Sequence, residues 1–342
     1  MSDKRRRIGL FRGRPNKRII RATINNHKNL IVENLGIDFN FDHLYRDIMW
    51  SKGPKRDNYS KVRTNISSNE TNIINQIDKI NMNDNILFIR NGNGTKTRDL
   101  EYFSNNLDKL GKLERPIFLI TSDGDRAVPS SYDPEIVNNI LNCTNIEKWY
   151  TQNYDESIKH DKLSHLPIGF DLHTSSWLIN NNIQEKIKYM LNCRFRSPIN
   201  KRISNRIYSD THHKYSHNDR KTLYELIKNN NYIDFSRGRK SFSSITENYN
   251  KYNFVLSPRG NGWDCHRTWE LFLAGVIVIT KTSPLDKMYL DNNLPVVILN
   301  DWNELNDNIA SKLEQWYRDQ IDKTNIDNIL PRLTFSYWIH HN

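Results

Sequence analysis

The strongest constraint on the fold lies in residues 253–280, which read NFVLSPRGNGWDCHRTWELFLAGVIVIT. Residues 254–256 and 276–279 are short apolar runs, typical of strands that are covered on both faces. The segment 264–274 between them has the length of a crossover helix, and Gly275 stands where a glycine commonly ends a helix. Strands joined through such a helix are parallel. The stretch therefore predicts a βαβ unit.

The same alternation of strand, polar loop and helix recurs along the chain. Further apolar runs occupy residues 85–90, 116–121, 146–150, 206–209 and 295–299. After the last run, Asp301 is a candidate N-cap for a long amphipathic helix that reaches about residue 321. Because 342 residues exceed what one core usually holds, we predict an α/β protein with two Rossmann-like domains that face each other across a cleft.

This pattern predicts the organisation of the whole chain. We expect a basic N-terminal segment (1–20), an N-terminal Rossmann-like domain (21–175), a connector (176–200), a C-terminal Rossmann-like domain that binds the nucleotide (201–325), and a C-terminal segment (326–342) that can pack back on the N-terminal domain. The basic segment has three open interpretations: a solvated tail, a nuclear-import or nucleic-acid patch, or a loop of the fold.

Charge and composition narrow the class of partner and the location. The formal net charge of +11 predicts affinity for an anion such as a nucleotide, a nucleic acid or an acidic surface. The chain has no apolar run long enough to span a membrane, and its start lacks the apolar part of a signal peptide. Cys143, Cys193 and Cys265 are odd in number and far apart, which favours a reducing compartment. We expect a cytoplasmic protein without a membrane span, placed in the host cytoplasm or the virion if the source is a virus.

The predicted helix start carries an unusual charge. The N-terminus of a helix favours anions, yet His266 and Arg267 fall in the first turn. With Asp264 as N-cap, Arg267 and Glu270 lie on one face of the helix. A nucleotide would resolve the conflict, since arginine and the helix amides bind its diphosphate and the carboxylate binds ribose hydroxyls. The alternative is that the glycines only form a turn and Arg267 meets a surface carboxylate. The predicted nucleotide-sugar site comprises Ser257, Arg259, Gly260, Asn261, Gly262, Asp264, Arg267 and Glu270.

The stretch from Phe254 to Ile279 resembles the C-terminal signature of exostosin-like glycosyltransferases. In that signature a strand, a Pro-Gly loop, an arginine, an acidic residue one turn later and an AGVIVI-like strand follow in order. Weaker matches resemble exostosin-like proteins of algae, protists and large DNA viruses: residues 122–125 with Val128-Pro129, Trp149 with Asn153, and LPIGFDLHT at 166–174. The matches cover roughly residues 120–280.

This resemblance implies a GT-B fold and a function. A sugar would move from a nucleoside diphosphate donor, a UDP- or GDP-sugar, to a hydroxyl of a glycan or glycoprotein, with inversion and without a metal or other cofactor. It also implies that Arg267 contacts the diphosphate, that Glu270 contacts the ribose or donor sugar, and that the loop at Ser257 and 260–262 lies near the phosphates. Arg259 departs from the pattern, where relatives have a smaller residue, and is either a second phosphate ligand or a solvated side chain.

The reaction also needs a general base for the acceptor hydroxyl. The candidates are Asp125, at the tip of a strand of the N-terminal domain, and Asp171 and His173 in the LPIGFDLHT segment. Each also fits an N-cap or turn role. Cys265 and His266 do not form a nucleophile and base, because consecutive helical side chains point about 100° apart.

Other functions stay open at this point. Asp123 and Asp125 form the Asp-x-Asp pattern with which GT-A glycosyltransferases hold Mg²⁺ or Mn²⁺, although GT-A needs no second glycine-rich βαβ unit so far along the chain. A basic nucleic-acid-binding protein and a glycosyltransferase fold kept only for binding are further alternatives. The histidines His212, His213 and His217 lack the partners of a zinc site. We therefore expect no bound metal.

Overall fold

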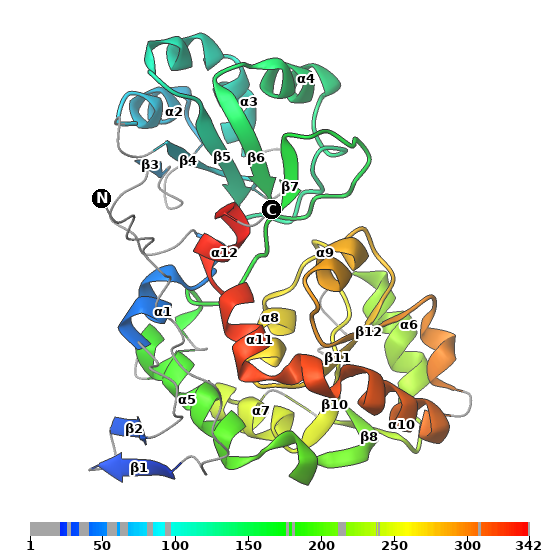
Figure 1. The fold of residues 1–342 in the computed structure, drawn as a ribbon. Coiled ribbons are helices and arrows are strands. Elements are labelled where there is room, and N and C mark those ends of the chain that lie inside the picture. The colour runs from blue at the N-terminus through cyan, green and yellow to red at the C-terminus, as the bar shows by residue number, and fades with distance from the viewer. Residues whose placement is uncertain are drawn as a thin grey trace, which may run out of the picture.

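The computed structural model describes residues 21–25, 29–33, 41–52, 60–61, 68–80, 85–92, 97–175, 178–179, 182–210, 217–236, 238, 240–306 and 309–340 (Figure 1). The expected basic segment 1–20 and the histidines His212 and His213 lie outside the described residues. No helix within the described ranges is long and apolar enough to span a membrane.

The first sheet is parallel and its strands follow chain order. It consists of β3 (Ser60–Lys61), β4 (Ile86–Arg90), β5 (Ile117–Ser122), β6 (Ile146–Thr151) and β7 (Leu163–His165). The helices α2 (Glu70–Ile77), α3 (Asp99–Ser104) and α4 (Pro134–Asn142) and the 3₁₀ helix η2 (Leu107–Lys112) share one apolar cluster with its strands. Alternate strand residues face this cluster, since Leu87 and Ile89 belong to it whereas Phe88 packs in the cluster on the opposite face.

The second sheet is also parallel, but its order reverses. Its strands are β8 (Ile203–Ser209), β9 (Ile233–Phe235), β10 (Tyr252–Leu256), β11 (Ile277–Lys281) and β12 (Val296–Leu299), in the order β12-β11-β10-β8-β9. Its helices are α5 (Ile183–Arg196), α6 (Asn218–Ile227), α7 (Phe242–Tyr249), α8 (His266–Leu273), α9 (Asp286–Asp291) and α10 (Ile309–Gln320), with the 3₁₀ helix η4 (Ile199–Lys201) before β8. Apolar clusters cover both faces, as a doubly wound sheet requires. The order reverses between β8 and β10, which makes the carboxyl ends of these strands the expected ligand crevice.

These two sheets confirm the predicted fold class: α/β, GT-B, with two Rossmann-like domains (Figure 1). Two details of the prediction are wrong. The crossover helix begins at His266 with Cys265 as its N-cap, so Asp264 lies outside it. The helix expected after Asp301 is divided into the 3₁₀ helix η5 (Trp302–Leu305), which Asp301 caps with a capping box, and α10. Gly275 has the predicted left-handed conformation, with φ of 69°.

Segments from distant parts of the chain meet between the sheets. They are α1 (Phe41–Asp47) with residues 48–50, the segment 166–172, the 3₁₀ helix η6 (Ile321–Thr324), α11 (Ile326–Arg332) and α12 (Phe335–His340); a hairpin of β1 (Arg21–Asn25) and β2 (Asn29–Glu33) precedes them. Met49 N donates to Leu333 O at 2.8 Å, and Phe170 N donates to Met49 O at 3.0 Å. From α12, Ile339 O accepts from the Tyr150 hydroxyl of β6 at 3.1 Å. Figure 1 shows α12 between the two sheets. The expected domain limits stay predictions.

Gly169 has no tolerance for a side chain at this junction. Its φ is 65°, and a Cβ there would lie 2.2 Å from Met49 O. We predict that Gly169→Ala lowers the free energy of unfolding by at least about 2 kcal/mol, because strain and the clash add. The urea midpoint measures this loss. Gly111→Ala is the matched control, since a Cβ there meets nothing within 4 Å. Equal midpoints for both variants would contradict the prediction.

Candidate functional site

The partner of Arg267 lies across the point where the strand order reverses. Arg267 Nε is 3.0 Å from Oδ1 of Asp210, which directly follows β8. The Tyr249 hydroxyl donates to the other carboxylate oxygen of Asp210. Burial alone would lower the pKa of Arg267, but the Asp210 carboxylate raises it above its usual value, so the arginine stays charged. The Asp210 carboxylate therefore compensates the positive charge that Arg267 places at the start of the helix.

One edge of the Arg267 guanidinium stays available to a ligand. Its Nη1 is buried and has no hydrogen-bond partner among the described residues. Such a donor is costly to leave unpaired inside a protein. An anion placed at the carboxyl ends of β8 and β10 would satisfy it.

A second arginine, Arg220, lies near this position and contacts the loop that carries a third, Arg259. Arg220, in the first turn of α6, donates from Nε to Arg259 O at 2.8 Å. The Arg259 guanidinium lies 3.6 Å from the centre of the Trp263 ring and donates to Asn261 O at 2.8 Å. Burial and the nearby charge of Arg267 lower the pKa of Arg220, and burial lowers that of Arg259. Buried like charges in one place are the pattern of an anion site.

The sequence analysis missed Arg220. Its signal was the start of a helix after the first strand of the second sheet, a position that faces the same crevice as Ser257 in a doubly wound sheet. Ser257 itself is buried at the end of β10, and its Oγ lies 2.9 Å from Thr268 Oγ1.

The glycine loop contacts the first domain as well as the arginines. A Cβ on Gly262 would lie 2.8 Å from Asn153 Nδ2, whereas a Cβ on Gly260 would make ordinary contacts with Cys265 and Arg220. Close packing against Asn153 of the first domain therefore explains why position 262 is a glycine. The prediction that this loop lies beside the phosphates stays a prediction. Gly260 is the loop position that would leave space for a phosphate.

Asp264 holds the domains together. Its Oδ2 accepts from Ile168 N at 2.7 Å, and its Oδ1 accepts from Cys265 N at 2.9 Å and from Trp269 Nε1 at 2.8 Å. Its own amide donates to Asn153 Oδ1 at 2.8 Å. Burial raises the pKa of Asp264 to about 7. Protein donors thus already bind both oxygens of this carboxylate, and its predicted role as a nucleotide-sugar ligand stays a prediction.

Glu270 already has a cation beside it. Its Oε1 lies 2.6 Å from Nζ of Lys186, a fully buried lysine of α5 that also donates to Asp171 O at 2.5 Å. Burial raises the pKa of Glu270, and Lys186 opposes that shift. Its predicted contact with ribose or donor sugar stays a prediction. Through its contact with Lys186, Glu270 connects α8 to α5.

Asp171 and His173 lie together near the start of α8. His173 Nδ1 is 3.3 Å from Asp171 Oδ1, and the rings of His173 and His266 have centroids 5.5 Å apart. Burial would raise the pKa of Asp171, but the neighbouring His266, Lys186 and His173 hold it below its usual value. Asp171 Oδ1 also accepts from Thr174 N at 3.0 Å, which is the alternative turn role.

Asp125 occupies a different place from this pair. It lies on the loop that follows β5 in the first domain, and its charge opposes the lowering of the Arg259 pKa by burial. The Asp-x-Asp segment is shaped by backbone packing: Asp123 has φ of 60°, and a Cβ on Gly124 would lie 2.2 Å from Gly92 N. Within the described ranges, no group of three or more His, Cys, Asp or Glu side chains is placed to hold a metal ion.

The remaining histidine and cysteine predictions concern single contacts. His266 Nδ1 lies 2.8 Å from Gly169 O, whereas Cys265 Sγ contacts Pro258 O, so the two side chains diverge as predicted. His217 is the N-cap of α6, with Nδ1 accepting from Asp219 N at 3.3 Å.

The chain was also compared with known proteins. No protein-family model matches it, and no curated protein matches it in sequence. Among solved structures, an α,α-trehalose-phosphate synthase (UDP-forming) from Burkholderia vietnamiensis aligns with 10% identity and a TM-score of 0.38, covering 77% of this chain and 76% of that chain. A UDP-GlcNAc 2-epimerase from Methanocaldococcus jannaschii aligns with 12% identity and a TM-score of 0.33, covering 75% and 76%. A glycosyltransferase from Rickettsia africae aligns with 13% identity and a TM-score of 0.35, covering 82% and 85%.

Likenesses at these TM-scores carry no inference about the site, which rests on its own residues. The resemblance to exostosin-like glycosyltransferases stays a prediction.

We predict that Asp264→Ala destabilises the protein by about 3 kcal/mol or more. The change leaves three buried N–H donors without an acceptor, and each unsatisfied donor costs about 1–3 kcal/mol. Urea denaturation measures the effect. Asp319→Ala is the control, because Asp319 is exposed and accepts a hydrogen bond from its helical neighbour Gln315. A midpoint for Asp264→Ala equal to that of the control would show that Asp264 does not hold the domains.

We also predict a pH dependence that His266 carries. Burial lowers the pKa of His266 to about 4, and the groups that face it are Asp171, His173 and Lys186. Because an unfolded histidine has a pKa near 6.5, the unfolded chain takes up the proton first as the pH falls. The stability that neutral His266 provides is present above pH of about 6.5 and is lost toward pH 4, by up to about 3 kcal/mol. Unfolding curves of the natural protein and His266→Gln, measured from pH 7 to 4, should converge; parallel curves would contradict this.

Proposed function

We propose that this protein is a glycosyltransferase that uses a nucleoside diphosphate sugar, a UDP- or GDP-sugar, as donor and a hydroxyl of a glycan or glycoprotein as acceptor. The observation that carries the proposal is Arg267, paired with Asp210 where the strand order reverses, whose buried Nη1 has no hydrogen-bond partner among the described residues. Arg220, near Arg267, and Arg259, on the loop that Arg220 contacts, would add positive charge for a diphosphate. We also propose a cytoplasmic location.

In the proposed reaction the acceptor oxygen attacks the anomeric carbon while the bond from that carbon to the diphosphate breaks. Negative charge grows on the leaving diphosphate, and the arginines and the amides at the start of α8 stabilise it. This arrangement supports transfer without a metal ion. A single displacement of this kind inverts the anomeric configuration.

The acceptor hydroxyl must give up its proton, and the geometry favours His173 among the three predicted candidates. Its Nδ1 faces Asp171, which orients the ring and stabilises the charge that the ring acquires. About a third of its side chain is exposed, with a relative accessibility of 35%, so Nε2 can reach a substrate. Asp125 lies on the loop after β5, and its charge opposes the lowering of the Arg259 pKa by burial.

Nucleotide binding tests the proposal, and Arg267→Lys is the informative variant. Lysine keeps a charge beside Asp210 but loses the two-pronged geometry that fits a phosphate. We expect UDP or GDP to raise the melting temperature of the natural protein by mass action, in the presence or absence of EDTA. Arg267→Lys should bind the nucleotide at least about tenfold more weakly. Arg318→Lys, an exposed arginine paired with Glu314 on α10, is the control.

Three outcomes contradict parts of the proposal. No shift with any nucleoside diphosphate would overturn the function. A shift that EDTA abolishes would favour metal-dependent binding at Asp123 and Asp125. Undiminished binding by Arg267→Lys would show that the nucleotide lies elsewhere.

A further inference from the structure

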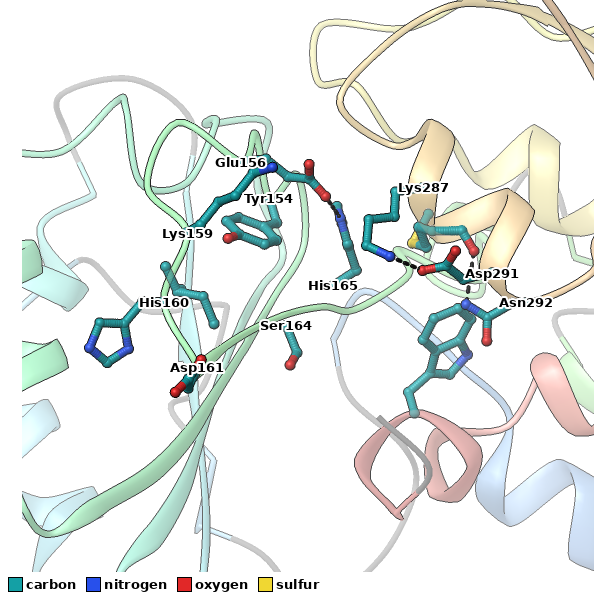
Figure 2. A pocket seen from close by; sticks show the side chains of 13 residues that line it. Tyr154, Glu156, Lys159, His160, Asp161, Ser164, His165, Lys287, Asp291 and Asn292 are labelled. Atoms are coloured by element: carbon teal, nitrogen blue, oxygen red, sulfur yellow. Dashed lines mark hydrogen bonds and ion pairs between the residues drawn. The ribbon is translucent and has the colours of Figure 1, made fainter.

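A second pocket, of ≈380 Å³, lies between the two domains (Figure 2). The loop between β6 and β7 provides Tyr154 and Glu156, and His165 ends β7. Lys287 of α9 lies on the opposite wall, and Trp338 of α12 lies beneath. The volume falls within the roughly 300–1,000 Å³ of small-molecule sites. Three segments that are far apart in the sequence thus build one binding-sized space.

This pocket carries charges of both signs with one more carboxylate than ammonium group, unlike the arginine site. Its carboxylates are Glu156, Asp161 and Asp291, and its ammonium groups are Lys159 and Lys287. Lys287 forms an ion pair with Asp291 one turn along α9. A diphosphate would meet more carboxylates than cations here. A ligand rich in hydroxyls fits better, because each hydroxyl both donates and accepts hydrogen bonds.

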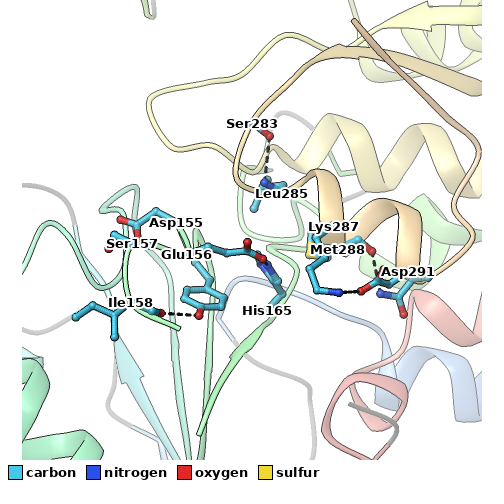
Figure 3. Close-up of polar contacts among 12 residues, drawn as sticks. Asp155, Glu156, Ser157, Ile158, His165, Ser283, Leu285, Lys287, Met288 and Asp291 are labelled. Atoms are coloured by element: carbon cyan, nitrogen blue, oxygen red, sulfur yellow. Dashed lines mark hydrogen bonds and ion pairs between the residues drawn. The ribbon is translucent and has the colours of Figure 1, made fainter. Parts of the chain in front are cut away.

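The wall at Glu156 is ordered before any ligand arrives. Glu156 has φ of 54°, an uncommon conformation for a residue other than glycine, and its Oε1 lies 3.1 Å from His165 Nε2 (Figure 3). The ring of Tyr154 packs 4.8 Å from that of His165. Tyr154 and Trp338 are almost completely buried and add apolar ring surface to the lining of the pocket. Polar groups at a rim above aromatic rings suit the two kinds of surface of a sugar ring.

Helix α9 connects the pocket to the arginine site. Thr282 and Ser283, just before α9, line a small pocket with Ser257 and Arg259, whereas Lys287 and Asp291 of α9 line the larger pocket. Figure 3 shows Ser283, Leu285, Lys287 and Asp291 in succession along this segment. A molecule in the larger pocket would therefore lie close to a donor bound at the arginines.

We propose that this pocket binds an uncharged saccharide through Glu156, His165, Lys287 and Asp291. The next step rests on the proposed function: that saccharide is the acceptor whose hydroxyl receives the sugar. The side chains on both walls would then contact one ligand.

Saturation-transfer NMR on the full chain tests the binding step without catalysis. The probes are the neutral disaccharides lactose, cellobiose, maltose and xylobiose, each with and without UDP. We expect at least one of them to bind, and we expect Glu156→Gln and Asp291→Asn each to weaken that binding at least fivefold. Glu135→Gln on α4 and Asp319→Asn on α10 are matched controls, since both residues are exposed and outside the pocket. Circular dichroism and melting temperature verify that each variant is folded.

The outcomes separate this inference from the proposed function. Failure of all four disaccharides, or equal binding by the pocket variants and their controls, overturns the pocket even if UDP binds. Binding of a glucuronate-containing disaccharide in place of all neutral ones overturns the uncharged class. If Arg267→Lys still binds the disaccharide, the pocket is supported as a saccharide site. This result holds even if no nucleotide binds and the proposed function fails. If turnover is observed, Glu156→Gln should raise the acceptor KM and leave the donor KM unchanged.

Discussion

The buried carboxylate of Asp264 is the interaction on which the rest of this structure depends. It accepts hydrogen bonds from Ile168, Cys265 and Trp269, so it joins the segment between the domains to the start and the first turn of α8. A buried carboxylate is stable only when such donors surround it. These bonds determine where α8 begins, and therefore where every side chain along it points. The position of the candidate site follows from that start.

Helix α8 distributes three charged or polar side chains to three different partners. His266 contacts Gly169 between the domains, Arg267 pairs with Asp210 after β8, and Glu270 pairs with Lys186 of α5. Consecutive helical residues point about 100° apart, which is why neighbours in sequence serve separate purposes. Asp210 compensates the cation at the start of the helix, and within the described part of the chain Arg267 keeps a buried donor without a partner, which an anion could use.

Much of the fold could be predicted from the sequence, and less of the site. Apolar runs such as 254–256 and 276–279 correspond to β10 and β11, because a strand buried on both faces must be apolar throughout. Arg267 attracted attention because its charge opposes the helix dipole. Lys186 carried no local signal, since its role depends on Glu270 of another helix, and Arg220 was signalled only by its place at a helix start after the first strand of the second sheet. Asp264 was taken for a cap, because a short-range pattern cannot distinguish an N-cap from a long-range acceptor.

The sequence by itself determined the alternation of strands and helices, the parallel sheets and the glycine at position 275, because these depend on periodicity and on backbone conformation within a few residues. Only the tertiary structure decided that Asp210 faces Arg267, that Asn153 requires a glycine at position 262, and that Tyr154 and Lys287 border the same pocket. Those relations join residues separated by tens to more than a hundred positions. They arise when two separately folded sheets are brought together through a shared apolar cluster, and no local pattern in the chain encodes that distance.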